Sequence, residues 1–219
     1  MKILMQPSGP SIVFPQPSDS RHALAALLIF TWHSLPAEGA KNRLWDRTFF
    51  ELALNRWLHF QIGCSDMTTT ILFHIGIMSL HCNLQDFHNV IGDFSQPGRV
   101  AVALPDAVRD WHRSDDCDIA LLHAEQVLAI GRSLVSKRRT SSRDGEISWL
   151  VDEPPHIAIC VYLAVITAWV AKIVDSQNTD TAKAILSTGC SVLSRLDLRI
   201  ATGLLNILRR LEEHSIHEH

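Results

Sequence analysis

Paired metal-binding cysteines are missing from this chain. Its five cysteines stand far apart, at Cys64, Cys82, Cys117, Cys160 and Cys190, and no two of them form a Cys-x-x-Cys pair. The spacing therefore favours neither a structural zinc site nor a dithiol redox motif. Scattered cysteines in odd number are instead typical of free thiols in a reducing intracellular compartment.

The chain also lacks an excess of basic residues. It carries 20 Lys and Arg residues against 23 Asp and Glu residues, a formal net charge of −3. DNA-binding modules usually have a basic footprint, so this balance favours a protein-facing or self-associating domain. The sequence contains no Gly-x-Ser-x-Gly elbow and no phosphate-binding glycine-rich loop, which argues against the enzyme classes that these motifs define.

Alternating strand patterns are absent too, and so is an apolar run long enough for a membrane. The longest uncharged apolar run covers residues 157–171, which is 15 residues, whereas crossing a bilayer takes about 20. We therefore expect a central helix that is buried on most sides. With 219 residues, 47% of them apolar and 20% charged, the composition is that of one globular domain.

Capping residues and apolar spacing divide the chain into a proline-rich tail and a series of helices. Residues 1–18 contain four prolines, which oppose a helix, and residues 19–219 are expected to form a single helical domain. The predicted helices cover residues 19–35, 41–60, 65–81, 84–91, 114–135, 154–174, 179–198 and 200–213, and residues 99–111 are weakly helical, with a helix starting at Asp106 or kinked at Pro105. Two alternatives stay open: Pro105 kinks a helix instead of starting one, and Gly189 breaks the helix from residue 179. The elements predict an all-α, multi-helix globular domain around the central apolar helix.

Apolar stripes indicate which helix faces are buried. The first helix has its stripe at Leu24, Leu27, Leu28 and Trp32. In the second helix, residues at three- and four-residue steps lie near one another: Leu44, Trp45, Thr48, Leu52 and Leu58. In the helix from residue 114 the stripe is Ile119, Leu122, Val127, Ile130 and Leu134. Residues 136–148 are polar and basic, and we expect an exposed loop there.

Three histidines are the clearest candidates for metal ligands. His74, His81 and His88 are spaced seven residues apart, so an uninterrupted helix would place them roughly on one face, and zinc accepts three imidazoles. However, Asn83 is expected to break that helix, and no carboxylate is placed as in a His-Glu-x-x-His motif. We therefore favour helix-surface or core-edge histidines, and we assign no catalytic, cofactor-binding or metal-binding residue.

Other clusters have a structural interpretation that is favoured over a functional one. The acidic residues Asp115, Asp116 and Asp118 complement the dipole in the first turn of a helix. The basic run 137–139 is a solvated loop, with a nuclear-import or phosphate-contact signal as the alternative. The terminal run 212–219 suggests adventitious metal binding at most. Core packing is favoured over a ligand cage for the aromatic residues Trp111, Trp149, Tyr162 and Trp169.

Three segments, taken in order, resemble a known family. Residues 71–81 and 84–87 read as a helix, a break and a short helix. Residues 111–135 carry Ala120, His123, Ala124, Gln126 and Leu128, and residues 153–169 carry Tyr162, Ala164 and Trp169. Together they resemble, over roughly residues 65–175, the regulatory middle homology domain of fungal-specific transcription factors, as found in zinc-cluster and zinc-finger regulators.

The resemblance implies a nuclear regulatory domain that controls transcription by RNA polymerase II. Its expected partners are the transcriptional machinery or co-regulators, with a homodimer as a further expectation and no membrane. In this family, zinc and DNA are bound by a separate cysteine-rich module, and no residue of this chain supplies it. We therefore expect no cofactor in this chain and no enzymatic activity. The alternatives are a helical metal-dependent enzyme using His74 and His81, and a structural or membrane-associated protein using residues 157–171.

Overall fold

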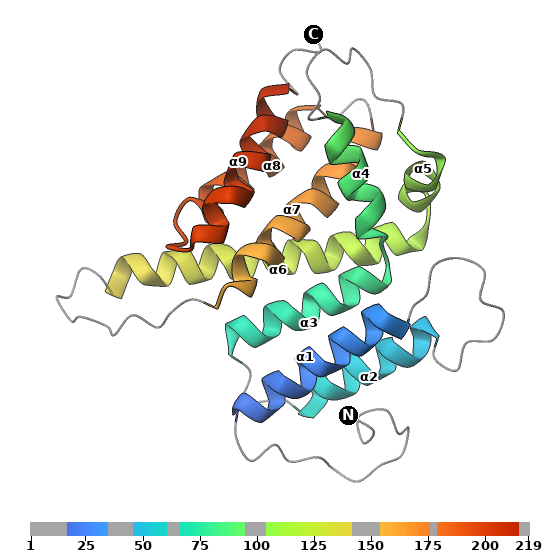
Figure 1. Cartoon of the computed structure of the whole chain (residues 1–219), viewed down its shortest axis with the longest axis vertical. Coiled ribbons are helices and arrows are strands. Elements are labelled where there is room, and N and C mark those ends of the chain that lie inside the picture. The colour runs from blue at the N-terminus through green and yellow to red at the C-terminus, as the bar shows by residue number, and fades with distance from the viewer. Residues whose placement is uncertain are drawn as a thin grey trace.

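Regular structure throughout the described part of this chain is helical. The computed structural model describes residues 17–34, 46–60, 66–94, 104–141, 154–175 and 179–214, and no strand occurs in these ranges. Their helices, in order, are α1 (Pro17–Ser34), α2 (Arg47–Phe60), α3 (Met67–Leu80), α4 (Leu84–Phe94), α5 (Asp106–His112), α6 (Asp115–Ser141), α7 (His156–Val174), α8 (Thr179–Leu193) and α9 (Arg199–His214) (Figure 1). The predicted all-α, multi-helix fold is confirmed.

The helix starts follow the capping residues read from the sequence. Asp66 caps α3, and its Oδ1 accepts a hydrogen bond of 2.7 Å from the Thr69 backbone N–H. Helix α5 begins directly after Pro105, so that proline starts a helix and does not kink one. Helix α7 likewise begins directly after Pro155. Three aspartates occupy the first turn of α6, as the helix dipole favours.

Three predicted helix ends were wrong. Helix α4 extends to Phe94 and includes Gly92. Helix α6 extends to Ser141, so residues 136–141 are helical and not a loop; Lys and Arg are good helix formers, and this outweighs their polar character. Helix α8 passes through Gly189 and ends at Leu193. Gly189 is tolerated because neighbouring helices need the space that a side chain would fill.

Helix α7 is the centre of the molecule, as the apolar run predicted. It contacts α3, α4, α5, α6, α8 and α9, and Figure 1 shows it in the middle of the bundle. Because it is surrounded in this way, it is buried on most of its circumference. The residues of α7 that are no more than 1% exposed are Ile157, Ala158, Val161, Ala164, Val165, Ile166, Thr167, Trp169, Val170 and Ala171.

Helix α3 separates two hydrophobic clusters. The larger one, here called the main core, surrounds α7 and includes Ile71, Ile75 and Met78 of α3. The smaller one, the α1–α2 core, includes Phe73 and Ile77 of α3 together with buried residues of α1 and α2. Helices α1 and α2 pack side by side against α3 (Figure 1). Because α3 contributes to both clusters, its sequence is apolar all round and not on one stripe.

Several stripe residues point to solvent instead of the core. Trp32, Leu52 and Leu122 are 53%, 53% and 55% exposed. In α6 the buried face uses small residues, Ala120, Ala124 and Gly131, because α6 packs closely against α3 and α7. Of the stripe predicted for α6, Val127 is fully buried, and Ile119, Ile130 and Leu134 are partly buried against the two clusters, so that only Leu122 was assigned to the wrong side. Leu24, Leu27 and Leu28 of α1 are buried as predicted.

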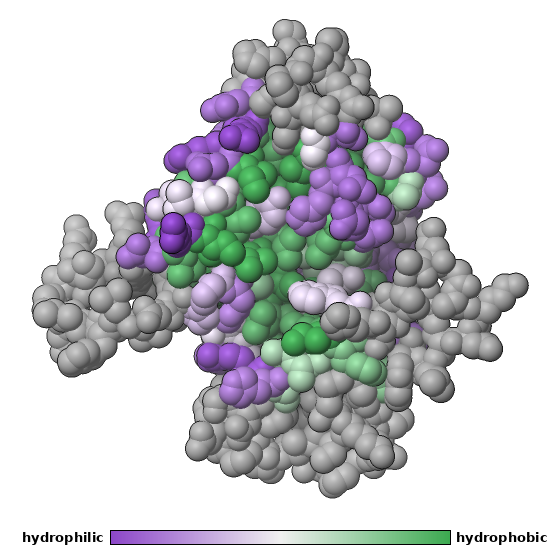
Figure 2. Space-filling view, in the orientation of Figure 1, coloured by the Kyte–Doolittle hydropathy of each residue, from purple (hydrophilic) through white to green (hydrophobic). Residues whose placement is uncertain are grey.

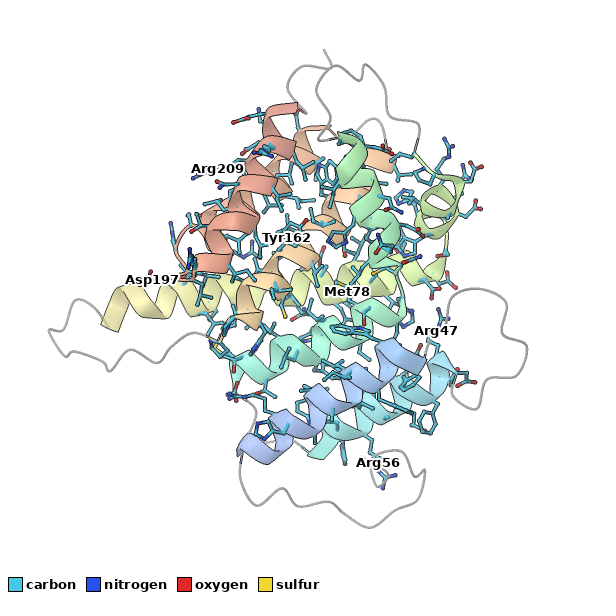
Figure 3. All side chains as sticks on the ribbon, in the orientation of Figure 1. Arg47, Arg56, Met78, Tyr162, Asp197 and Arg209 are labelled. Atoms are coloured by element: carbon cyan, nitrogen blue, oxygen red, sulfur yellow. The ribbon has the colours of Figure 1, made fainter. Side chains whose placement is uncertain are left out.

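The surface of the described residues is mixed. Figure 2 shows apolar residues across the middle of one face and hydrophilic residues over α4 and the outer side of α9. Met78 and Tyr162 lie inside the bundle, whereas Arg47, Asp197 and Arg209 lie at its edges (Figure 3). Only α7 among the described helices is long and apolar enough to cross a membrane, and 72% of its 18-residue window is buried inside the protein.

Some predicted features lie outside the described residues. These are the tail over residues 1–16, residues 41–45 of the predicted second helix, the polar loop over 142–148, Trp149, Cys64 and the last five residues, 215–219. The single-domain boundary at residue 19 stays a prediction, although α1 itself begins at Pro17.

Candidate functional site

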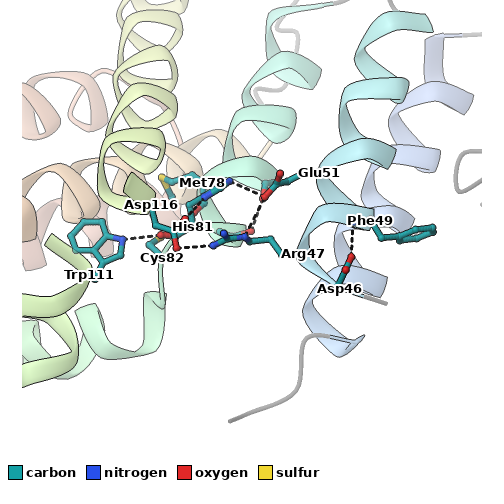
Figure 4. A network of polar contacts seen from close by, with 11 residues as sticks. Asp46, Arg47, Phe49, Glu51, Met78, His81, Cys82, Trp111 and Asp116 are labelled. Atoms are coloured by element: carbon teal, nitrogen blue, oxygen red, sulfur yellow. Dashed lines mark hydrogen bonds and ion pairs between the residues drawn. The ribbon is translucent and has the colours of Figure 1, made fainter. Parts of the chain in front are cut away.

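A buried histidine links three helices at the end of α3. His81 is 5% exposed and follows the last turn of α3. Its Nδ1 lies 2.8 Å from Oδ1 of Asp116 at the start of α6, and its Nε2 lies 3.2 Å from Oε1 of Glu51 in α2. Both ring nitrogens therefore face carboxylate oxygens, so the His81 side chain joins acidic groups of two different helices. The cluster of His81, Glu51, Asp116 and Arg47 is called the His81 network below (Figure 4).

An arginine balances the two carboxylates of the His81 network. Arg47 Nη1 lies 2.6 Å from Oδ2 of Asp116, and Arg47 Nε lies 3.3 Å from Oε1 of Glu51. Hydrogen bonds from His81 and Arg47 hold the pKa of Asp116 below its usual value, although burial, the largest single influence, acts to raise it. The network thus joins α2 to the α3–α6 contact by charge-assisted hydrogen bonds.

A small cavity lies beside the His81 network. Its volume is about 260 Å³. The turn between α3 and α4, together with α4, α5 and the start of α6, encloses it through His81, Cys82, Asn83, Asp86, Phe87, Ala107, Val108, Trp111 and Asp116. Trp111 is fixed in this wall because its indole N–H donates a 2.7 Å hydrogen bond to the His81 carbonyl oxygen. Its ring meets Phe87 edge-on, with the ring centroids 4.7 Å apart.

The cysteine in the cavity wall does not form a nucleophile with His81. The Cys82 thiol donates to the Met78 carbonyl oxygen at 3.2 Å. Burial raises the pKa of this thiol to about 12, so it is protonated at neutral pH and a weak nucleophile. Burial similarly raises the pKa of Cys117 to about 11 and that of Cys160 to about 12. These three thiols behave as small apolar groups.

A second histidine pair lies in the same α3–α6 contact. His74 Nδ1 and His123 Nδ1 are 2.9 Å apart, a hydrogen-bond distance that places one proton between them. Burial and the neighbouring His123 lower the pKa of His74 to about 4. Burial, and then the charge of His81, lower the pKa of His123. The pair is therefore neutral at pH 7 and stabilises the helix contact in that form.

The three candidate metal ligands do not come together. His74 pairs with His123, His81 belongs to its own network, and the exposed His88 in α4 bonds the Leu84 carbonyl oxygen at 2.7 Å. The break at residues 81–83 turns α4 away from the line of α3, as Asn83 predicted. No cluster of three or more His, Cys, Asp and Glu residues within the described ranges is placed to hold a metal ion.

The three aspartates in the first turn of α6 have different surroundings. Asp116 joins the His81 network, whereas Asp115 and Asp118 are exposed in the first turn. The basic run 137–139 lies on the last turns of α6, and its side chains are outside the described residues.

The aromatic residues do not form a cage. Tyr162 is buried with its ring 6.0 Å from His88, and Trp169 meets Phe94 at 5.3 Å. The buried Trp169 indole N–H has no hydrogen-bond partner within the structure described. Of the members that the structure describes, which exclude Trp149, Trp111 lines the cavity and Tyr162 and Trp169 do not.

Sequence reasoning missed the partners that complete the site. Nothing in the pattern linked Arg47 and Glu51 to His81, although their spacing of four residues is that of a helical ion pair. His123 was noted within a family-like segment, but its contact with His74 spans 49 positions. Such long-range pairs depend on how helices cross, which local periodicity does not report.

The geometry defines an all-α domain with a polar junction between α2, α3 and α6 and a small cavity beside it. The chain matches no protein-family model, no curated protein and no solved structure.

Proposed function

We propose that the chain is a regulatory domain of a fungal transcription factor. In this proposal it acts in the nucleus and controls transcription by RNA polymerase II through co-regulators, the transcriptional machinery or a small effector. DNA contact and zinc binding belong to a separate module, and self-association into a homodimer is part of the proposal.

The order of the helices is the observation that carries this proposal. A helix, a break and a second helix occupy residues 67–94, and α6 and the apolar α7 follow in that order. These are the segments in which the sequence resembles the family. Within them, Ala120, Ala124 and Ala164 are fully buried, so the small residues of the resemblance serve close helix packing.

The His81 network supports a role in signalling between parts of the domain. It connects α2, which belongs to the α1–α2 core, with the start of α6, and it lies beside a cavity. A ligand or partner that changes the position of Asp116 would therefore act on both hydrophobic clusters. Coupling between the two hydrophobic clusters requires an element that contacts both of them. Helix α3 has that position, because it contributes residues to the main core and to the α1–α2 core.

A tethering assay tests the proposal. The whole chain is fused to an unrelated DNA-binding domain and brought to a reporter promoter in a fungal host. We expect reporter transcription to change several-fold relative to the DNA-binding domain alone, because a regulatory domain acts wherever it is recruited. The matched control is the same fusion carrying Ala164→Asp, which places a charge in the main core.

Two results would contradict the proposal. One is a reporter level equal to that of the DNA-binding domain alone while the fusion is abundant and nuclear. The other is an equal effect from the Ala164→Asp fusion, because that would show that the folded domain is not required.

A further inference from the structure

One carboxylate in the cavity wall is not used by the fold. The Asp86 side chain lies in the first turn of α4 and lines the cavity. Among the described residues no hydrogen bond or ion pair engages its carboxylate, in contrast to Asp116, whose two oxygens are taken by His81 and Arg47. The dipole of α4 and solvent stabilise the half-buried Asp86 carboxylate, but no cationic side chain of the described residues pairs with it.

The rest of the wall suits a cation with an apolar part. The half-buried Trp111 and the exposed Ala107 supply accessible apolar surface, whereas Phe87 and Val108 are buried behind them. The face of a Trp ring attracts cations within about 6 Å. His81 is the only basic residue in the wall, and its two nitrogens are already engaged. An anion would meet two carboxylates and no free donor of positive charge, so its binding is disfavoured.

The volume limits the size of the ligand. At ~30 Å³ for each water-sized group, 260 Å³ holds about eight such groups. Sites for drug-sized molecules usually exceed about 300 Å³. A metal ion does not fit, because the described part of the chain brings no three ligand side chains together.

We propose that this cavity is a binding site for a small organic cation, an alkylammonium compound of a few carbon atoms. The ammonium group pairs with Asp86, and the alkyl part packs against Trp111 and Ala107. The inference goes beyond the proposed function, because binding is a property of the purified protein whether or not the chain regulates transcription.

Isothermal titration calorimetry of the whole purified chain tests the site. The probes are n-propylammonium, its anionic counterpart propionate and the neutral n-butanol. We expect saturable binding of propylammonium at one site per chain, weaker binding of butanol and none of propionate. Raising the ionic strength should weaken the propylammonium interaction, since it includes an exposed charge pair.

Three variants connect the binding to the cavity. Asp86→Asn keeps the shape and removes the charge, so affinity for propylammonium should fall about tenfold. Asp110→Asn makes the same change on the exposed side of α5, away from the cavity, and should leave affinity unchanged. Ala107→Phe adds bulk at the cavity wall and should abolish binding of every probe. Melting temperatures close to wild type establish that each variant is folded.

The proposal is overturned if no probe binds saturably. It is also overturned if propionate binds as well as propylammonium, or if Asp86→Asn leaves the affinity unchanged. A regulatory effect in the tethering assay without ligand binding would support the proposed function and overturn the binding site. Ligand binding without a regulatory effect would support the binding site and contradict the proposed function.

Discussion

At the scale of single residues, specific partners determine the charge state of several half-buried polar groups. Asp66 is an example: burial, the largest influence, acts to raise its pKa, yet hydrogen bonds from Thr68, Arg21 and Thr69 outweigh it and hold the pKa well below its usual range. Its ion pair with Arg21, 2.8 Å long, connects α1 to the start of α3. His74 is the opposite case, because burial beside His123 favours its neutral form.

The His74 pair predicts a loss of stability in mild acid. The folded pKa of about 4 lies below the ordinary value of 6.5, so the unfolded chain takes up the proton first as the pH falls. The contribution to stability is complete above pH 6.5 and is lost as the pH falls towards 4. Allowing for partial exposure, we expect His74 to account for about 1 kcal/mol of the decrease between pH 7 and pH 5.

Urea unfolding of His74→Gln at the two pH values measures this effect. The decrease in unfolding free energy should be smaller than in the wild type. His22→Gln, a change at an exposed position of α1, is the control and should keep the wild-type decrease. An unaltered pH dependence in His74→Gln would show that this histidine is not held neutral by the fold.

At the scale of the helices, glycines mark the closest contacts. A Cβ added to Gly189 in α8 would lie 2.5 Å from Val165 of α7 and 3.0 Å from Leu208 of α9. A Cβ added to Gly76 of α3 would likewise lie 2.5 Å from the Leu28 side chain of α1. Glycine lowers helix propensity by about 1 kcal/mol relative to Ala, and at these positions that cost is accepted so that three helices can cross closely.

Gly189→Val should therefore destabilise the protein. Added bulk in a well-packed contact costs about 1–3 kcal/mol, which exceeds the gain in helix propensity. Gly203→Val in α9 is the matched control, because nothing lies within 4 Å of its Cβ position, and it should be neutral or slightly stabilising. Thermal unfolding of both variants is the measurement. Equal melting temperatures would mean that α7, α8 and α9 do not pack as closely as described.

At the scale of the whole molecule, stability depends on one central element. The main core forms around α7, and the α1–α2 core is attached to it through α3. Leu72 packs against both clusters. A change in α7 should therefore affect the unfolding of the entire chain, whereas a change in α1 should act first on the smaller cluster.

Ala164→Asp tests the central position of α7. Ala164 is 0% exposed, and an unpaired carboxylate there costs several kcal/mol, which is comparable to the total stability of a domain. We expect loss of the cooperative thermal transition. Ile159→Asp changes a residue of the same helix that is 39% exposed, and it should keep a cooperative transition. A native melting temperature for Ala164→Asp would make the assignment of the core wrong.

The sequence predicted the elements better than their contacts. Local signals were enough to predict where helices start, because Asp66, Pro105 and Pro155 each lie directly before the first turn of the helix that they begin. They placed Val127 of α6 correctly in the core but misplaced Leu122, which points to solvent while the small residues Ala120 and Ala124 are buried. The candidate site was predicted only in part: His81 and Asp116 were each noted, but their 2.8 Å contact depends on tertiary packing.

The position of α7 along the chain has a consequence for synthesis. Its partners α3, α4, α5 and α6 all precede residue 156. Although α3 and α6 contact each other, the faces that these four helices turn toward α7 stay uncovered until the ribosome has released α7. A growing chain that ends before this point exposes apolar helix faces, which is the condition under which nascent proteins aggregate or recruit chaperones. Formation of the main core should therefore wait until α7 has been synthesised, and removal of α7 to α9 should harm solubility more than removal of α1.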